Sequence, residues 1–244
     1  HDLTNQRKLE RVRRDFVANA SHELRTPLSI IKGYVETLVD GHETMPLEDR
    51  AKFLKTIQRH SERLKFIIDD LLALSRLESS TPGLTFAPLA LGPFLSGLAD
   101  DYRHRPAAAG HELTVQVDPE LTPIDADAEK LTQVFGNLIE NALKYTPKGT
   151  RVEIGVHGFG IGHVECYVRD SGAGIPAEDL PHIFERFFRV EKGRSRETGG
   201  TGLGLSIVKH IVQLHGGEVW AENRDAGGLA IRVRLPRSQA RKAP

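Results

Sequence analysis

The sequence has one cysteine, one methionine and one tryptophan among its 244 residues, and only 6% of them are aromatic. The single cysteine, Cys166, excludes an intrachain disulfide framework, and its apolar neighbours predict a small core side chain. No run approaches the roughly 18 consecutive apolar residues that a membrane-spanning helix needs. Lys plus Arg equals Asp plus Glu at 33 each, so no excess of charge favours binding to nucleic acid. These features predict an ordinary globular protein that is long enough for two domains.

The first 80 residues contain little glycine and have the apolar spacing of amphipathic helices. Apolar residues recur every three or four positions from about Asn5 to Asp40, and a second run with this period ends near Leu77. Helix-breaking residues at 41–46 separate the two runs, which predicts a helical hairpin. One hairpin covers only part of two such stripes. We therefore expect a second copy of the chain to complete a four-helix bundle, which makes the protein a homodimer.

The composition changes after residues 79–83, whose Ser-Ser-Thr-Pro-Gly sequence predicts a linker. Glycine becomes frequent, and short β-like runs mix with helical ones, which predicts an α+β sandwich. The expected strands are 113–117, 151–156, 164–168 and 230–235, and the expected helices are 92–109, 128–145 and 206–214. The expected organisation is a helical domain at 1–80, a linker at 81–87, an α+β domain at 88–237 and a tail at 238–244.

Ser21-His22-Glu23-Leu24-Arg25-Thr26-Pro27-Leu28 lies in the first expected helix. Helical spacing places His22, Glu23 and Thr26 where all three can address one exposed surface. An imidazole beside a carboxylate can act as a nucleophile with a neighbouring base. A lone helical histidine is nevertheless more often a solvated or packed residue. Thr26 has two interpretations as well, since its hydroxyl can position a water or bond back to the carbonyl of His22.

Asn137 and Asn141 lie four residues apart in the expected helix 128–145, with Lys144 and Tyr145 one turn beyond. An amide oxygen is a suitable ligand for a Mg²⁺ ion that phosphates already partly neutralise, and a lysine can meet those phosphates as a point charge. The plain polar face of an amphipathic helix explains the same spacing.

Asp170-Ser171-Gly172-Ala173-Gly174-Ile175-Pro176 follows an apolar strand. A carboxylate at the end of a strand can accept a hydrogen bond from an exocyclic amine such as N6 of adenine. Glycines beside it let a flat ring approach the backbone closely. A simple Asp-containing turn is an equally good interpretation.

Phe184 to Arg189 and the polar run 190–200 predict an aromatic patch followed by a lid, although the aromatic residues fit a plain core as well. Gly199 to Leu205 opens the last expected helix, so its backbone N–H groups can face an anion. A tight structural turn is the commoner meaning of such glycines. No Lys-Ser or Lys-Thr follows, and the spacing differs from Gly-x-Gly-x-x-Gly, which disfavours both a Walker A loop and a dinucleotide fingerprint. The basic residues expected to approach phosphates are Arg186, Arg189, Lys192 and Arg194.

Together these segments resemble the sequence boxes of sensor histidine kinases over nearly the whole chain. The segment around His22 resembles the phosphoacceptor box, and the later segments resemble, in order, the N, G1, F and G2 boxes. The resemblance implies a HisKA-type dimerisation hairpin followed by a HATPase_c domain with the Bergerat-type ATP-binding fold. Within the family, the sequence looks most like kinases of the phosphate-sensing type.

The resemblance also implies roles for particular residues. ATP and Mg²⁺ are the expected cofactors, with Asn141 as the metal ligand. His22 is the expected phosphoacceptor, and Glu23 and Thr26 are expected to assist it. The expected ATP-binding residues are Asn137, Asn141, Lys144, Tyr145, Asp170, Gly172, Gly174, Ile175, Arg186, Phe187, Arg189, Gly200, Thr201, Gly202, Leu203, Gly204 and Leu205.

The implied reaction is ATP-dependent phosphorylation of His22, followed by transfer to an aspartate of a response regulator receiver domain. Removal of phosphate from that regulator is expected as well. The chain starts at His1-Asp2 without methionine. It therefore resembles an excised cytoplasmic portion of a bacterial inner-membrane sensor, touching the membrane only through a region upstream.

Two other classes of function compete with this interpretation. An ATP hydrolase of the chaperone or repair kind shares the nucleotide boxes, but such relatives carry a water-activating glutamate where this chain has Asn137, and a neutral amide cannot be that base. A degenerate scaffold that binds without transfer is disfavoured by the intact His22, Asn141 and Asp170. Labelled ATP separates the three classes through labelled protein, released phosphate or neither.

Overall fold

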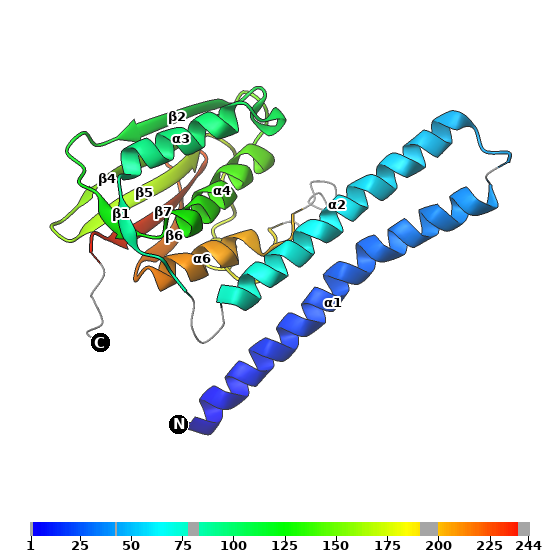
Figure 1. Ribbon diagram of the computed structural model, residues 1–244, viewed down its shortest axis with the longest axis horizontal. Coiled ribbons are helices and arrows are strands. Elements are labelled where there is room, and N and C mark those ends of the chain that lie inside the picture. Colours follow the sequence, from blue (N-terminus) through cyan, green and yellow to red (C-terminus); the bar gives the residue numbers. More distant parts are fainter. Residues whose placement is uncertain (1, 42, 78–82, 191–199, 239–244) are drawn as a thin grey trace.

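The computed structural model describes residues 2–41, 43–77, 83–190 and 200–238. Helices α1 (Asp2–Asp40) and α2 (Leu47–Leu77) form the predicted hairpin, which projects from a sheet-containing body (Figure 1). Helix α1 continues through Pro27. At the turn, the Gly41 N–H donates to Thr37 O at 3.0 Å and the Met45 N–H donates to Gly41 O at 2.9 Å. None of the described helices is long and apolar enough to cross a membrane.

The body is built on a five-stranded sheet in the order β2-β4-β5-β7-β6. Strand β2 pairs parallel to β4, and the remaining neighbours pair antiparallel. Two short strands form a separate antiparallel pair, of which one precedes β2 in sequence and the other follows it. The main strands are β2 (Glu112–Val117), β4 (Arg151–Phe159), β5 (His163–Asp170), β6 (Glu218–Asn223) and β7 (Leu229–Pro236), and the short pair is β1 (Ala87–Leu89) with β3 (Ile124–Ala126).

Helices α3 (Leu91–Arg103), α4 (Ala128–Tyr145) and α6 (Gly204–Leu214) cover one face of this sheet (Figure 1). The hydrophobic core lies between them and the strands, with fully buried side chains such as Phe135, Ile154 and Ile207. The layers confirm the predicted α+β sandwich. The end of α2 joins the same core through Leu74 and Leu77, so the hairpin is packed against the body.

One expected helix was too long. Residues 92–109 were predicted as one helix, but α3 ends at Arg103 and only a short 3₁₀ helix follows at Pro106–Ala108. Proline disfavours the helical conformation of the residue before it, here Arg105, whose φ and ψ are extended at −81° and 145°. No strand was predicted from the sequence at the positions of β1, β3 or β6. The proposed domain boundaries stay a prediction, although β1 already begins at Ala87 inside the predicted linker.

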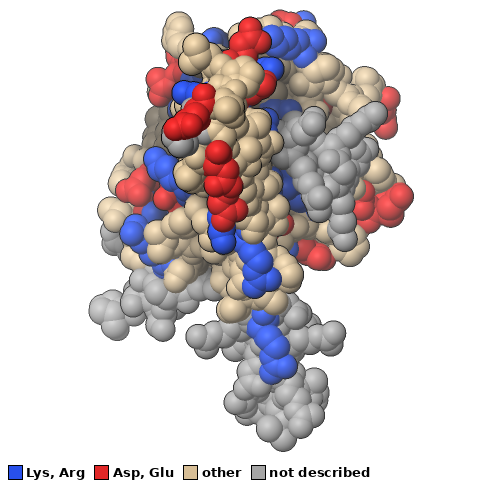
Figure 2. Space-filling view, turned by 90° about the vertical axis from the view of Figure 1, so that its right-hand side faces the viewer, with Lys and Arg blue, Asp and Glu red and all other residues tan. Residues whose placement is uncertain are grey.

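Acidic and basic side chains are interspersed on the side of the molecule where the hairpin lies (Figure 2). This distribution agrees with the equal totals of 33 positive and 33 negative residues in the sequence.

Candidate functional site

His22 is exposed on α1, and its neighbours tie that helix to α2. The Glu23 side chain forms an ion pair with Arg63 of α2, with 3.1 Å between Oε2 and Nη2. Thr26 Oγ1 donates a 3.2 Å hydrogen bond to His22 O, which is the local bond anticipated as one of its two interpretations. The imidazole is thus available to solvent on a helix whose neighbouring carboxylate is held in place.

Helix α4 presents its polar face away from the core. Asn137 and Asn141 are half-buried, whereas the opposite face carries buried residues such as Phe135 and Ile139. The helix begins at a capping residue, Asp127, whose carboxylate accepts a 3.0 Å hydrogen bond from the Lys130 N–H. This cap holds the first turn, since the early N–H groups of a helix otherwise have no partner.

Asp170, at the end of β5, is buried to 7% exposure, and its carboxylate is held by backbone groups. Its Oδ1 accepts hydrogen bonds from the Gly172 N–H at 2.8 Å and the Leu229 N–H at 3.3 Å. Gly172 lies against Thr146, where an added side-chain carbon would be 2.8 Å from Thr146 Cγ2. The G1-like loop therefore packs directly on the end of α4.

The glycine loop before α6 closes the same site. A side-chain carbon at Gly200 would lie 2.4 Å from the Tyr145 hydroxyl and 3.1 Å from Lys144 Nζ. A side-chain carbon at Gly204 would lie 3.2 Å from Asn137 Oδ1. The loop and the helix start therefore lie directly against the polar face of α4. The structure brings the N-like and G2-like segments together.

The F-like segment packs under this loop. Phe187 has a positive φ of 63°, which is uncommon for a residue with a side chain, and its N–H donates to Gly202 O at 2.8 Å. The Phe187 ring lies 5.8 Å from that of Phe16 on α1, and the Arg186 guanidinium lies 5.2 Å from the Phe16 ring. The aromatic residues therefore pack as core and also join the nucleotide side of the body to the helix that carries His22.

Comparison with known proteins agrees with this geometry. Residues 12–80 match the family model of the His Kinase A (phospho-acceptor) domain, and residues 126–239 match that of the histidine kinase-, DNA gyrase B- and HSP90-like ATPases. The solved structure of the mycobacterial sensor histidine kinase MprB is 31% identical in sequence, with a TM-score of 0.53 over 62% of this chain and 97% of MprB. This chain belongs to the histidine kinase family.

Some relatives of the chain are considerably longer than the chain itself. Sensor protein kinase WalK of Staphylococcus epidermidis is 38% identical over 237 residues, which cover 97% of this chain but 38% of WalK. The kinase thus spans well under half the length of that relative. Histidine kinase ThkA, solved in complex with response regulator protein TrrA, shares the fold, with 24% identity and a TM-score of 0.75 over 97% of this chain and 67% of ThkA.

Lys144 near the end of α4 and Asp70 on α2 lie within electrostatic reach of each other. Burial lowers the pKa of Lys144 to about 8, with the positive charges of Arg189 and Arg63 acting in the same direction. Burial raises the pKa of Asp70, although the hydrogen bond from Thr201 and the charge of Lys144 oppose that shift. A lysine whose charge is partly desolvated gains from an added anion, so Lys144 is suited to a phosphate.

Several residues that hold the segments of the site in place were not predicted as functional. Asp70 accepts a hydrogen bond from Thr201, and His210 Nε2 donates to Leu77 O at 2.9 Å. Asn223 and Arg224 contact the loop after Asp170. An acidic residue inside the apolar stripe of α2 was the signal for Asp70. Asn223 had only a weak signal, an asparagine next to the polar turn Arg224-Asp225-Ala226-Gly227-Gly228.

Part of the predicted lid, with Lys192 and Arg194, lies outside the described residues. Within the described residues, no group of three or more histidine, cysteine, aspartate or glutamate side chains could hold a metal ion.

Proposed function

We propose that this chain is the catalytic core of a two-component sensor kinase, which transfers the γ-phosphoryl group of ATP to His22 and then to an aspartate of a response regulator. The observation that carries the proposal is the packing of Phe16 on Phe187. Phe16 lies less than two helical turns before His22 on α1. The body therefore contacts the helix that carries the exposed imidazole.

The proposed reaction forms a bond between an imidazole nitrogen of His22 and the γ-phosphorus and breaks the bond from that phosphorus to the bridging oxygen, releasing ADP. Glu23 is placed to take or orient the imidazole proton, and its ion pair with Arg63 holds the carboxylate in position. A positioned base of this kind contributes roughly 10²- to 10⁴-fold in rate.

ATP recognition is assigned to the loops gathered around α4. Asp170 is proposed to accept a hydrogen bond from N6 of adenine, Lys144 to meet the phosphates, and the N–H groups from Gly202 to Leu205 to face them at the start of α6. The same assignment extends to the remaining predicted residues of the N, G1, F and G2 boxes.

Mg²⁺ is proposed to bind between the ATP phosphates and Asn141. The residues present fit such an ion, because Asn141 offers a neutral oxygen on the half-buried polar face of α4 and Lys144 lies one turn away. When bound, Mg²⁺ would neutralise phosphate charge. Asn137, an amide at the position where ATP-hydrolysing relatives carry glutamate, favours transfer to His22 over transfer to water.

The proposed partners are a second copy of the chain and a receiver domain. ThkA, which shares the fold, was solved in complex with response regulator protein TrrA, and this supports a receiver domain as a partner here. The match to the phospho-acceptor domain and the exposed apolar side chains of the hairpin support the dimer. Because the WalK relatives are longer sensor kinases, we place the chain on the cytoplasmic side of a membrane-anchored sensor. A phosphate-sensing specialisation stays a prediction.

Incubation with Mg²⁺ and γ-labelled ATP tests the proposal. Wild type should acquire a label that is acid-labile and base-stable, as a phosphoramidate is. His22→Gln should lose the label while its calorimetric affinity for ATP is unchanged, and Glu23→Gln should label at least a hundredfold more slowly. Label that survives acid or persists on His22→Gln would contradict the phosphoacceptor assignment. Released phosphate without labelled protein would identify a hydrolase.

A further inference from the structure

Asn223, the last residue of β6, holds the loop after Asp170 by a reciprocal pair of hydrogen bonds. The Ile175 N–H donates to Asn223 Oδ1 at 2.9 Å, and Asn223 Nδ2 donates to Ile175 O at 2.6 Å. The side-chain amide thus binds Ile175 as a neighbouring β-strand would. Residues 171–176 form neither helix nor strand, so their conformation depends on such contacts from elsewhere in the fold.

The turn that follows β6 supports Asp170 itself. Arg224 Nη1 donates to Asp170 O at 2.6 Å, and the Leu229 N–H donates to its carboxylate. Gly228 packs so closely that an added side-chain carbon would lie 2.0 Å from Asp170 O. Residues 223–229 therefore contact the G1-like loop at both of its ends.

The contact at Gly174 shows that the side-chain amide of Asn223 lies tightly against the backbone of the loop. Its φ is +76°, and a side-chain carbon there would lie 2.6 Å from Asn223 Oδ1. The glycine is required both by its backbone conformation and by the space that Asn223 occupies.

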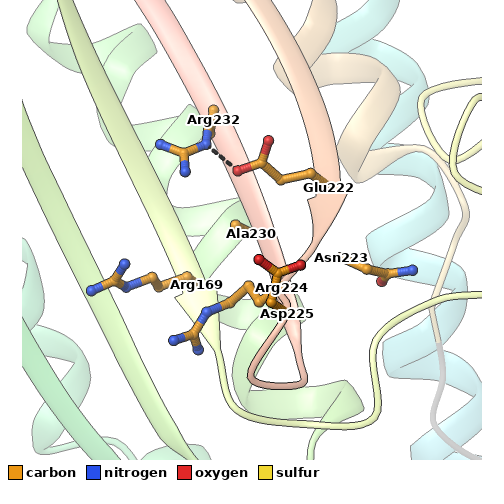
Figure 3. A pocket seen from close by; sticks show the side chains of 7 residues that line it. All are labelled: Arg169, Glu222, Asn223, Arg224, Asp225, Ala230 and Arg232. Atoms are coloured by element: carbon orange, nitrogen blue, oxygen red, sulfur yellow. Dashed lines mark hydrogen bonds and ion pairs between the residues drawn. The ribbon is translucent and has the colours of Figure 1, made fainter.

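The neighbouring charged residues on the strands, Arg169, Glu222 and Arg232, form ion pairs within the sheet and do not hold the loop. A cavity of about 380 Å³ is lined by Arg169, Glu222, Asn223, Arg224, Asp225, Ala230 and Arg232. Figure 3 shows Asn223 and Arg224 leaving the end of β6 in different directions, with Arg232 joined to Glu222 on the strands above. Arg232 also pairs with Glu165, and Arg169 pairs with Glu153, so these arginines already bind carboxylates.

We propose that Asn223 is a positioning residue that sets the selectivity of the nucleotide site for adenine, by holding residues 172–175 against the ring and keeping the Gly172 N–H on the carboxylate of Asp170. The inference rests on the proposed role of Asp170 in adenine recognition. Without the clamp, the loop is free to leave its binding conformation, and the carboxylate of Asp170 loses the shorter of the two hydrogen bonds that orient it. Selectivity thus depends on a residue that does not itself touch the nucleotide.

The experiment compares ATP with inosine triphosphate, which has an acceptor oxygen in place of the N6 donor and so offers Asp170 no hydrogen bond at that position. Calorimetry on the full chain should show that Asn223→Ala weakens ATP binding roughly tenfold, as expected for losing two hydrogen bonds. Inosine triphosphate, already bound weakly, should lose less, so the ratio of the two affinities falls. Glu222→Gln, which alters the adjacent residue facing Arg232, is the matched control and should leave both affinities unchanged.

Asn223→Asp repeats the test with the side-chain volume preserved, since an aspartate keeps the acceptor for the Ile175 N–H but cannot donate to Ile175 O. Thermal unfolding of each variant establishes that it is folded. Equal losses for both nucleotides, or affinities equal to those of Glu222→Gln, would overturn the inference. Asp170→Asn, measured in parallel, separates the two proposals, because unchanged ATP affinity in that variant would refute the adenine role of Asp170 instead.

Discussion

Thr201 donates a 2.6 Å hydrogen bond from its Oγ1 to Oδ2 of Asp70, joining the glycine loop before α6 to helix α2 of the hairpin. The same hydroxyl oxygen accepts a hydrogen bond from the Leu203 N–H at 3.1 Å. The carboxylate of Asp70 is partly desolvated, and Lys144 lies within electrostatic reach of it. The Asp70 side chain of the hairpin thus contacts the loop that is proposed to bind phosphates and interacts electrostatically with Lys144, which is proposed to assist that loop.

Asp70→Ala should loosen the seating of the loop on α2. The variant leaves the Thr201 hydroxyl without its charged acceptor, a loss of about 1.5–3 kcal/mol for a hydrogen bond to a charged group. Hydrogen exchange of backbone amides around Leu203 and at the end of α2 should then accelerate about tenfold or more. Asp69→Ala, which removes the exposed neighbouring carboxylate, should leave both rates unchanged. Identical exchange in the two variants would show that Asp70 does not hold the loop.

Thr26→Ala should slow loss of phosphate from the regulator by about tenfold or more while autophosphorylation stays near the wild-type rate. The Thr26 side chain is exposed, and although its hydroxyl donates to His22 O, its oxygen can still accept from a water that attacks an aspartyl phosphate. Time courses with labelled regulator measure the rate. Thr26→Ser keeps the hydroxyl and should retain both activities. If autophosphorylation falls as much as dephosphorylation, Thr26 supports the helix instead.

The hairpin should form the dimer through apolar side chains that the single chain leaves exposed. Leu54 is 55% exposed, Phe66 is 61% exposed and Leu72 is 51% exposed. Light scattering should give twice the chain mass of 27.0 kDa for wild type. Phe66→Glu combined with Leu54→Glu should shift the protein toward the monomer mass, since a charge buried at an interface without a partner is costly. Ile161→Glu, at a fully exposed turn far from the hairpin in sequence, should remain dimeric.

His215 should make the stability of the body depend on pH. Its Nε2 accepts a 3.1 Å hydrogen bond from the Asp127 N–H, and its Nδ1–H donates to Ile211 O at 2.9 Å. Burial lowers the pKa of His215 below its ordinary value of 6.5, although the nearby Asp127 opposes this. Only the neutral His215 ring can accept the hydrogen bond from the Asp127 N–H, because protonation would place a hydrogen on Nε2. The unfolded chain therefore binds the proton more readily, and stability is lost as the pH falls below about 6.5.

Unfolding in denaturant at several pH values between about 7.5 and 5.5 measures this loss. His215→Gln, which keeps a donor and an acceptor but does not titrate, should have a flatter dependence than wild type. His60, whose pKa is also lowered by burial and by Arg59 and Arg63, contributes a loss of the same sign and is unchanged in that variant. Parallel curves for wild type and His215→Gln would contradict the assignment.

The sequence was sufficient where structure depends on neighbours along the chain. Apolar spacing predicted α1, α2 and α4, and alternation predicted β2, β4, β5 and β7, because side-chain period and secondary structure are set locally. Strands β1 and β3 have three residues each, too short for a periodic pattern. Arg105 was placed inside the expected helix 92–109, although the proline that follows it disfavours a helical conformation.

The sequence by itself also indicated the family, because His22, Asn141, Asp170 and the glycine loop occur in recognisable local spacing; the roles of these residues stay predictions. Only the tertiary structure showed how those segments are held. Asp70 meets Thr201 across 131 positions of sequence, and Asn223 meets Ile175 across 48. The hydrogen-bonding capacity of an isolated asparagine or aspartate does not identify its partner. That partner is decided by strand order and helix packing, which bring groups that are distant in sequence within 3 Å.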